Sequence, residues 1–167
     1  MSVKMLSDGR RRVTVCTVKP ANIGAPTLAE LNAGIYASPF IPKSTFTWSA
    51  GDPNTVNDTD LEKAFDVEVP TTDTYDLGFG AYRDFLPGGG FDSAGDALFQ
   101  AVKVKGTTIY VYVRWTDKLS TAAWATGDEI YLGGAVVTGT PKAVSEGYIK
   151  YAVPLFPSDL RTFIAAV

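Results

Sequence analysis

The chain has 167 residues, a formal net charge of −3 and a hydrophobic content of 46%. This size and composition suit a single domain, residues 1–167, with a buried core. Proteins that hold nucleic acid by neutralising phosphates are usually basic, so the acidic balance argues against tight DNA or RNA binding. One cysteine and no histidine argue against a disulfide-built module, a zinc site and the usual nucleophilic triads.

The N-terminal segment, residues 1–12, is predicted to be a polar, basic arm that leads into a first strand at 13–18. Cys16 lies inside that strand and is expected to be a buried structural residue, because no histidine is present to activate its thiol. The start of the chain has no apolar stretch of signal-peptide length, and no stretch approaches the roughly 20 apolar residues that span a bilayer. We therefore expect no membrane association and synthesis in a reducing cytoplasm.

A short helix is expected after residue 27. Thr27 and Glu30 have the spacing of a capping box, in which the two side chains satisfy each other's free backbone N–H groups. Gly34 is well placed to end this helix. One or two strands are then expected through 35–41 and 45–48.

A long polar segment, residues 49–63, follows these strands and shows no periodicity. It exceeds the usual length of a connection, and long loops of this kind are commonly binding elements or mobile ones.

Residues 64–83 carry the clearest period-two alternation and predict a β-hairpin with its turn at 70–73. One predicted face is aromatic and aliphatic, and the other is acidic or bare glycine. The acidic and glycine face includes Asp66, Glu68, Asp76, Gly78 and Gly80.

The C-terminal half predicts one helix, two more strand regions and an unassigned tail. Helical spacing covers residues 94–105, with Ser93 as the cap and Gly106 as the stop. A strand at 107–116 should place Ile109, Val111, Val113 and Trp115 on one face and Tyr110, Tyr112 and Arg114 on the other. A last hairpin should pair 129–138 with 147–155, and the tail, 157–167, has no assigned structure.

Together these elements predict a mainly β fold, a β-sandwich or small barrel with one flanking α-helix. The tryptophans Trp48, Trp115 and Trp124 are interpreted as core or interface residues, with the core favoured for Trp115.

No catalytic constellation is found. The pair Gly78-x-Gly80 fails as a dinucleotide-binding loop, because Arg83 occupies the third glycine position and the pair lies within a strand pattern. The acidic run that starts at Asp58 fails as a calcium loop, because Lys63 stands where glycine is needed. Asp66 and Glu68 are the nearest pair of carboxylates for glycoside chemistry, and solvation is the simpler explanation for them. We expect no enzymatic activity, no cofactor and no metal.

Several phrases of the sequence, taken in order, resemble one family. They are Ala25-Pro26-Thr27-Leu28-Ala29-Glu30-Leu31-Asn32-Ala33-Gly34, the run from Ala97-Leu98-Phe99 through Gly106-Thr107 to Tyr112-Val113-Arg114, and Trp124-Ala125-Thr126-Gly127-Asp128. Their order is similar to that of the major tail tube proteins of siphophages, especially those that infect actinobacteria. The likeness covers about residues 13–156 and is lost at 84–92.

This resemblance implies a virion structural protein in the phage tail. It implies a β-sandwich with a flanking helix that forms hexameric rings, and rings that stack into a hollow tube through which genomic DNA passes without specific binding. Inner sheets would join edge to edge, and a long loop and the terminal arms would lock ring to ring. The implied partners are further copies of the chain and the tape measure, terminator and baseplate proteins.

Two hypotheses about sites follow. The first places Asp66, Glu68, Asp76, Gly78 and Gly80 on the lumen wall. The second places contacts between rings in the arm 1–12 and the segment 49–63, at Arg10, Arg11, Arg12, Asp52, Asp58 and Asp60. Two alternative functions remain open at this point. One is an immunoglobulin-like surface binding module, and the other is a tail terminator or baseplate ring protein of the same fold.

Overall fold

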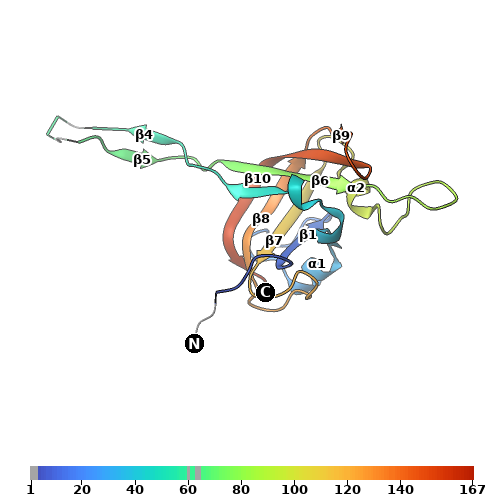
Figure 1. The fold of residues 1–167 in the computed structure, drawn as a ribbon. Coiled ribbons are helices and arrows are strands. Elements are labelled where there is room, and N and C mark those ends of the chain that lie inside the picture. Colours follow the sequence, from blue (N-terminus) through green and yellow to red (C-terminus); the bar gives the residue numbers. More distant parts are fainter. Residues whose placement is uncertain (1–3, 60, 63–64) are drawn as a thin grey trace.

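The computed structural model describes residues 4–59, 61–62 and 65–167 and shows a mainly β molecule with one large sheet (Figure 1). All strand pairs of this sheet are antiparallel. In spatial order the strands are β2 (Ile35–Tyr36), β1 (Arg11–Cys16), β7 (Thr108–Trp115), β8 (Glu129–Thr138), β10 (Lys150–Ala165), β6 (Tyr75–Tyr82) and β3 (Thr47–Ala50), with β9 (Lys142–Val144) also paired to β10. The predicted mainly β sandwich class is confirmed.

Strand β10 connects the two layers of the sandwich. Its first residues, 150–154, pair with β6, and its later residues, from Leu155 to Ala165, pair with β8. A register shift between Pro157 and Asp159 marks a bulge, which bends the strand and increases its twist. Opposite the bulge, Gly134 has a φ of 143°, and a Cβ there would overlap the Asp159 carbonyl oxygen. Only glycine therefore allows the two strands to approach this closely.

Two hydrophobic cores lie on opposite faces of β7. Ile109, Val111 and Val113 pack between the layers, in a core shared with Trp48, Phe79 and Val153 from the other half of the sheet. Tyr110 and Tyr112 face the second core, which holds Cys16, Leu31 and Trp124. The predicted alternation along this strand is confirmed for these five β7 residues. Trp115, interpreted as core, is 44% exposed and is the last residue of the strand.

The helix α1 (Leu28–Ala33) forms as predicted, with Thr27 and Glu30 in a capping box and Leu31 buried. The helix α2 (Ala97–Val102) is shorter than the predicted 94–105 and has no side-chain cap bond. The cap bond is missing because the buried carboxylate of Asp96, the residue before the helix, accepts hydrogen bonds from Arg83 and Gln100 instead. Asp96 thus anchors the preceding loop to the helix, and Ser93 stays outside the helix.

The predicted strand at 35–41 is wrong beyond Tyr36. The chain continues as two short 3₁₀ helices, η1 (Ser38–Phe40) and η2 (Lys43–Thr45). Pro39 and Pro42 explain the change, because proline has no N–H to donate to a sheet ladder.

The predicted hairpin over 64–83 is also wrong. β5 (Glu68–Pro70) does not fold back on β6 but pairs with β4 (Thr55–Asn57), while β6 pairs with β3. The pairs Thr47↔Gly78 and Asn57↔Glu68 belong to one constant register. Residues 47–57 and 68–78 are therefore the two legs of one long hairpin. Alternation shows which side chains share a face, but it does not show which strand is the partner.

The predicted loop 49–63 accordingly belongs largely to the first leg of this hairpin. The unassigned tail, 157–167, is also strand, since β10 is 16 residues long and ends at Ala165. The last predicted hairpin, 129–138 with 147–155, is wrong in its return strand. β8 pairs with residues 155–165 of β10, whereas residues 150–154 pair with β6 and 150–152 also with β9, so Leu155↔Thr138 is where the predicted return strand meets β8.

Candidate functional site

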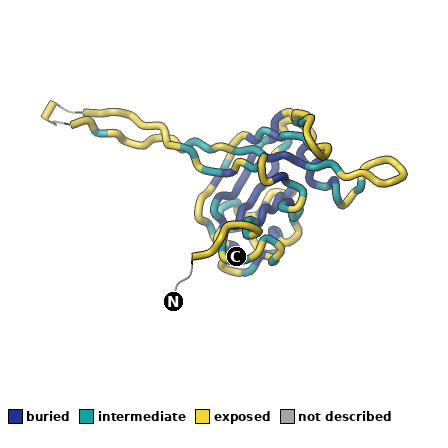
Figure 2. The backbone as a smooth tube through the Cα atoms, viewed as in Figure 1, coloured by how far each residue is buried: buried dark blue, intermediate teal, exposed yellow. Residues whose placement is uncertain are grey.

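The outer section of the long hairpin, residues 51–74, stands away from the sandwich and is here called the hairpin arm (Figure 1). Every residue of β4 and β5 is exposed, in contrast to the buried strands of the body (Figure 2). At about 3.3 Å per residue, the leg from Gly51 to Asn57 reaches about 20 Å. An isolated two-stranded hairpin is marginally stable in water. The arm therefore lacks the packing that would hold it in place within one subunit.

Apolar side chains are exposed along the arm. Val56 and Val69 face each other across the two strands and are 53% and 48% exposed. Near the tip, Leu61 and Phe65 are 107% and 70% exposed. Apolar surface of this kind, rimmed by polar residues, is typical of an interaction site.

The arm also carries much of the negative charge. Seven of the 18 acidic residues and one of the 15 basic residues lie in 51–74, so the arm has a formal charge of −6 and the rest of the chain has +3. Within the described residues, no ion pair is formed by the carboxylates of Asp52, Asp58, Asp66, Glu68 and Asp73. The arm is thus an acidic projection from a basic body.

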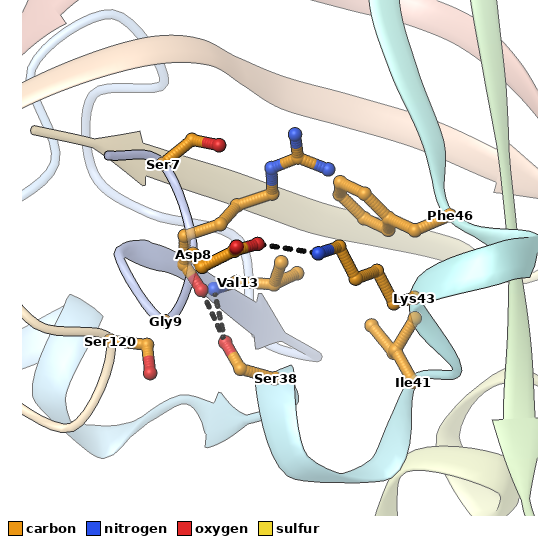
Figure 3. Close-up of a pocket in the computed structure, with 10 residues that line it drawn as sticks. Ser7, Asp8, Gly9, Val13, Ser38, Ile41, Lys43, Phe46 and Ser120 are labelled. Atoms are coloured by element: carbon orange, nitrogen blue, oxygen red, sulfur yellow. Dashed lines mark hydrogen bonds and ion pairs between the residues drawn. The ribbon is translucent and has the colours of Figure 1, made fainter.

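A cavity of about 230 Å³ lies between the N-terminal segment, residues 4–10, and the turns η1 and η2 (Figure 3). Ile41, Phe46 and Val13 form its apolar wall, and Lys43 and Asp8 form an ion pair at its edge. Both partners of this pair are highly exposed, at 86% and 75%. Exposed pairs of this kind contribute little to stability.

Arg11 lines the same cavity. Its guanidinium lies 5.1 Å from the centre of the Phe46 ring and 4.4 Å from that of the Trp115 ring. Within the described segments of the chain, no hydrogen bond or ion pair engages this guanidinium, whose five N–H groups are available as donors. Aromatic rings favour a cation in this position. Arg11 is therefore a fixed positive charge with its donors unused.

The neighbouring arginines are used inside the subunit. Arg10 donates to the Asp117 carbonyl oxygen. Arg12 is buried and donates to the carbonyl oxygens of Ser120 and Ala122, at 3.0 and 3.1 Å. Of the three arginines predicted to contact another ring, Arg11 is the one whose guanidinium has no hydrogen-bond or ion-pair partner in the described chain.

Of the three acidic residues predicted to contact another ring, two lie within the described residues. Asp52 and Asp58 are exposed on the arm. Asp60 lies outside the described residues. The acidic positions that are described therefore project away from the body together with β4.

The residues predicted to line a lumen are spread along the second leg of the long hairpin, from the arm to the body, and differ in exposure. Asp66 and Glu68 are exposed on the arm, and Asp76 is exposed on β6. Gly78 borders a shallow hollow of about 230 Å³ on the outer side of β6. Gly80 is buried, and a Cβ there would lie 2.5 Å from Thr45 Oγ1. This glycine makes room for Thr45, whose hydroxyl accepts a hydrogen bond from the Gly80 N–H.

The sequence interpretation missed a buried ionic centre under the loop 117–127. Arg114 is fully buried and bonds to Asp128 at 2.7 Å and to the carbonyl oxygens of Leu119, Ala122 and Ala123. Lys118 also bonds to Asp128. A charged residue between the apolar residues of β7 was the available signal, since a buried charge requires a partner.

The remaining chemistry is sparse. Among the described residues, no three His, Cys, Asp or Glu side chains lie together in a way that could hold a metal ion. Burial raises the pKa of the Cys16 thiol to about 11, so this cysteine is a thiol at neutral pH. Over the residues that the structure describes, no helix has both the length and the apolar character to cross a membrane.

A two-layer β body with an unsupported, charged and apolar arm defines a structural subunit that assembles through its surface. The family model for phage tail tube proteins matches residues 1–167. The chain therefore belongs to the phage tail tube protein family, which confirms the resemblance seen in the sequence and makes it a structural protein of the virion tail. No curated protein matches the chain. The family match replaces the immunoglobulin-like binding module as an explanation of the fold.

Proposed function

We propose that the chain is the major tail tube subunit of a siphophage, and that hexameric rings of it stack into a hollow conduit for genome delivery. The observation that carries the proposal is the hairpin arm, in a chain whose whole length matches the tail tube family. An arm with exposed apolar residues and little support of its own needs a neighbouring subunit to bury it. In this proposal the subunit is made in the host cytoplasm, has no enzymatic role and needs no cofactor.

The arm and the N-terminal segment are the proposed contacts between rings. A contact between unlike surfaces of identical subunits generates a ring or an open filament rather than a closed pair. Stacked rings require such a contact along the tube axis, and the arm is long enough, at about 20 Å, to reach past its own body. Tape measure, terminator and baseplate proteins would meet the same surfaces at the ends of the tube.

For the lumen, we keep Asp76 and Gly78 as the proposed wall residues. Asp76 is exposed and Gly78 leaves a hollow on the same outer side of β6. A carboxylate at the wall repels the phosphates of passing DNA and gives them no binding site. Asp66 and Glu68 are reassigned to the contact between rings because they lie on the arm, and Gly80 is left out because Thr45 covers it.

Electron microscopy of the purified chain, fresh and after concentration, tests the proposal. Hollow tubes of uniform width support it. Single rings that never stack support the alternative, a terminator or baseplate ring protein of the same fold. Monomers at every concentration contradict self-assembly of the chain alone. A map of the tube with Asp76 on the outer wall would refute the lumen assignment.

Removal of most of the hairpin arm is the second experiment. The Gly51 N–H bonds to the Thr74 carbonyl oxygen at 2.8 Å, so the two legs are already close at the body. Replacing residues 53–72 with an Asn-Gly turn, which suits a two-residue hairpin, should leave the body folded and abolish tubes. Tubes of normal length from this variant would show that the arm is not an assembly element.

A further inference from the structure

Two groups of opposite charge in this subunit form no ion pair with each other among the described residues. The arm carries a formal charge of −6, and its carboxylates at Asp52, Asp58, Asp66, Glu68 and Asp73 form no ion pair with described residues. Arg11 presents a guanidinium whose donors are unused, at the wall of a cavity of about 230 Å³. Guanidinium and carboxylate bind each other through paired, charge-assisted hydrogen bonds.

We propose that the cavity at Arg11 is the receptor for the hairpin arm of a second copy of this chain, and that it takes a carboxylate of that arm against the Arg11 guanidinium. This inference rests on the proposed function, because it names the acceptor for the contact between rings. The carboxylates at the outer end of the arm, Asp58, Asp66 and Glu68, are its candidate ligands.

The shape of the chain excludes its own arm as the occupant. The constant register from Thr47↔Gly78 to Asn57↔Glu68 makes the arm a continuous ribbon that points away from the body (Figure 1). The cavity lies on the body beside β1, at Arg11, Val13 and Phe46. A carboxylate from the arm therefore reaches this cavity from another copy.

The cavity suits both the apolar and the acidic residues of the arm. Its apolar wall of Ile41, Val13 and Phe46 matches the exposed pair Val56 and Val69. The rings of Phe46 and Trp115 hold the Arg11 guanidinium in place, so that little side-chain entropy is lost when a carboxylate binds.

The edge of the cavity already accommodates a carboxylate. Asp8 lies there in an exposed pair with Lys43. Because both groups are exposed, an incoming carboxylate can share Lys43 or displace Asp8 at little cost. The receptor therefore offers two cations, Arg11 and Lys43, to an arm whose formal charge is −6.

Disulfide trapping tests the contact in otherwise native chains. Cys16 is the sole cysteine and is buried, so an introduced cysteine reacts without competition. Chains with Lys43→Cys are mixed with tagged chains carrying Asp58→Cys, assembled, and oxidised. We expect a mixed dimer on a non-reducing gel. The control is Asp92→Cys, an intermediate-exposure position beside the glycine loop, and it should give no mixed dimer with Lys43→Cys.

Charge reversal at Arg11 gives a second, independent test. Arg11→Glu should raise the concentration needed for tubes at least tenfold, whereas Lys105→Glu, an exposed site with the same change in charge, should leave it unchanged. Circular dichroism and a thermal melt check that each variant folds. If Arg11→Glu does not fold, the disulfide test decides alone.

The outcomes separate the inference from the function. Tubes that form from the mixed Lys43→Cys and Asp58→Cys chains without a disulfide between the two positions, or normal assembly of Arg11→Glu, would refute the receptor and leave the tube subunit intact. No tubes from the native chain would refute the tube subunit itself. A tube whose Arg11 contacts an acidic segment other than the arm would also overturn the inference.

Discussion

Arg12 and Arg114 lie directly opposite each other on β1 and β7, and both donate hydrogen bonds to the carbonyl oxygen of Ala122. Two buried guanidinium groups thus hold the loop 117–127 by hydrogen bonds to its carbonyl oxygens. Burial lowers the pKa of Arg12, and the positive charge of Arg114 lowers it further. Asp128 is the acid that bonds to Arg114, and it also bonds to Lys118. The loop is therefore held by an arrangement that depends on one carboxylate.

Replacing that carboxylate should destabilise the whole body. Asp128→Asn leaves the Arg114 charge buried without its counterion, and breaking a buried pair from one side costs about 3–5 kcal/mol. Urea unfolding of the purified monomer should show this loss in the free energy of unfolding. Glu129→Gln, the exposed neighbour, is the matched control and should change the free energy of unfolding by less than about 0.5 kcal/mol. A loss below about 1 kcal/mol for Asp128→Asn would contradict the role of the pair.

The same carboxylate should make stability depend on pH. Burial pushes the Asp128 pKa upward, but hydrogen bonds from Lys118, the Ala125 N–H and Arg114 outweigh it, so the pKa is lowered on folding. The resulting stability is fully present above the unfolded value of about 3.9 and is lost as the pH falls through the lower folded value. Urea unfolding between pH 2 and pH 7, roughly the range of interest, should show a steeper acid loss for the native chain than for Asp128→Asn. Parallel curves for the two proteins would contradict this.

Two glycines of β6 should respond differently to the same substitution. Gly80→Ala places a methyl group 2.5 Å from Thr45 Oγ1 and forces Thr45 to give up its bond to the Gly80 N–H. We expect a loss of about 1–3 kcal/mol in the free energy of unfolding. At Gly78 the nearest atom to an added Cβ is the Val153 carbonyl oxygen, at an ordinary 3.6 Å. Gly78→Ala is therefore the control, and an equal loss at both sites would show that Thr45 is not the cause.

The apolar pair on the arm should matter for assembly and not for folding. Val56→Thr with Val69→Thr keeps the β-branched shape and removes apolar surface that is exposed in the monomer. We expect an unchanged thermal melt and a concentration for tube formation raised at least about tenfold, since burying a valine contributes about 1.5–3 kcal/mol. Val18→Thr, an exposed valine just beyond the end of β1, is the control. Light scattering against protein concentration measures the difference, and equal curves for all three proteins would remove this pair from the interface.

Local signals in the sequence predicted local structure well. The capping box at Thr27 and Glu30 and the two faces of β7 depend on contacts within a few residues or on strict alternation, and the structure confirms both. The family resemblance predicted the class of protein for a similar reason, because short motifs in a fixed order can be recognised in a sequence without knowing which residues are in contact.

The errors came from contacts that are distant in the sequence. Alternation at 65–69 and 75–82 fits a hairpin and a single long leg equally well, and only the partner strand at 47–57 decides between them. The burial of Arg114 depends on Asp128 and three carbonyl oxygens supplied by the following loop. The cavity at Arg11 needs the N-terminal segment, β1, η1 and η2 together, so no local pattern indicated it.

The constant register of the long hairpin sets how its length can change. One extra residue in a single leg would turn every side chain beyond it to the opposite face. One extra residue in each leg keeps the pairing and moves the tip outward by about 3.3 Å. The tip therefore advances in fixed steps, and two added pairs, or about 7 Å, are the smallest extension that also keeps the same side chains facing the same way. In the proposed assembly, the reach of the arm toward a neighbouring subunit can thus be lengthened in discrete increments while the sandwich itself remains unchanged.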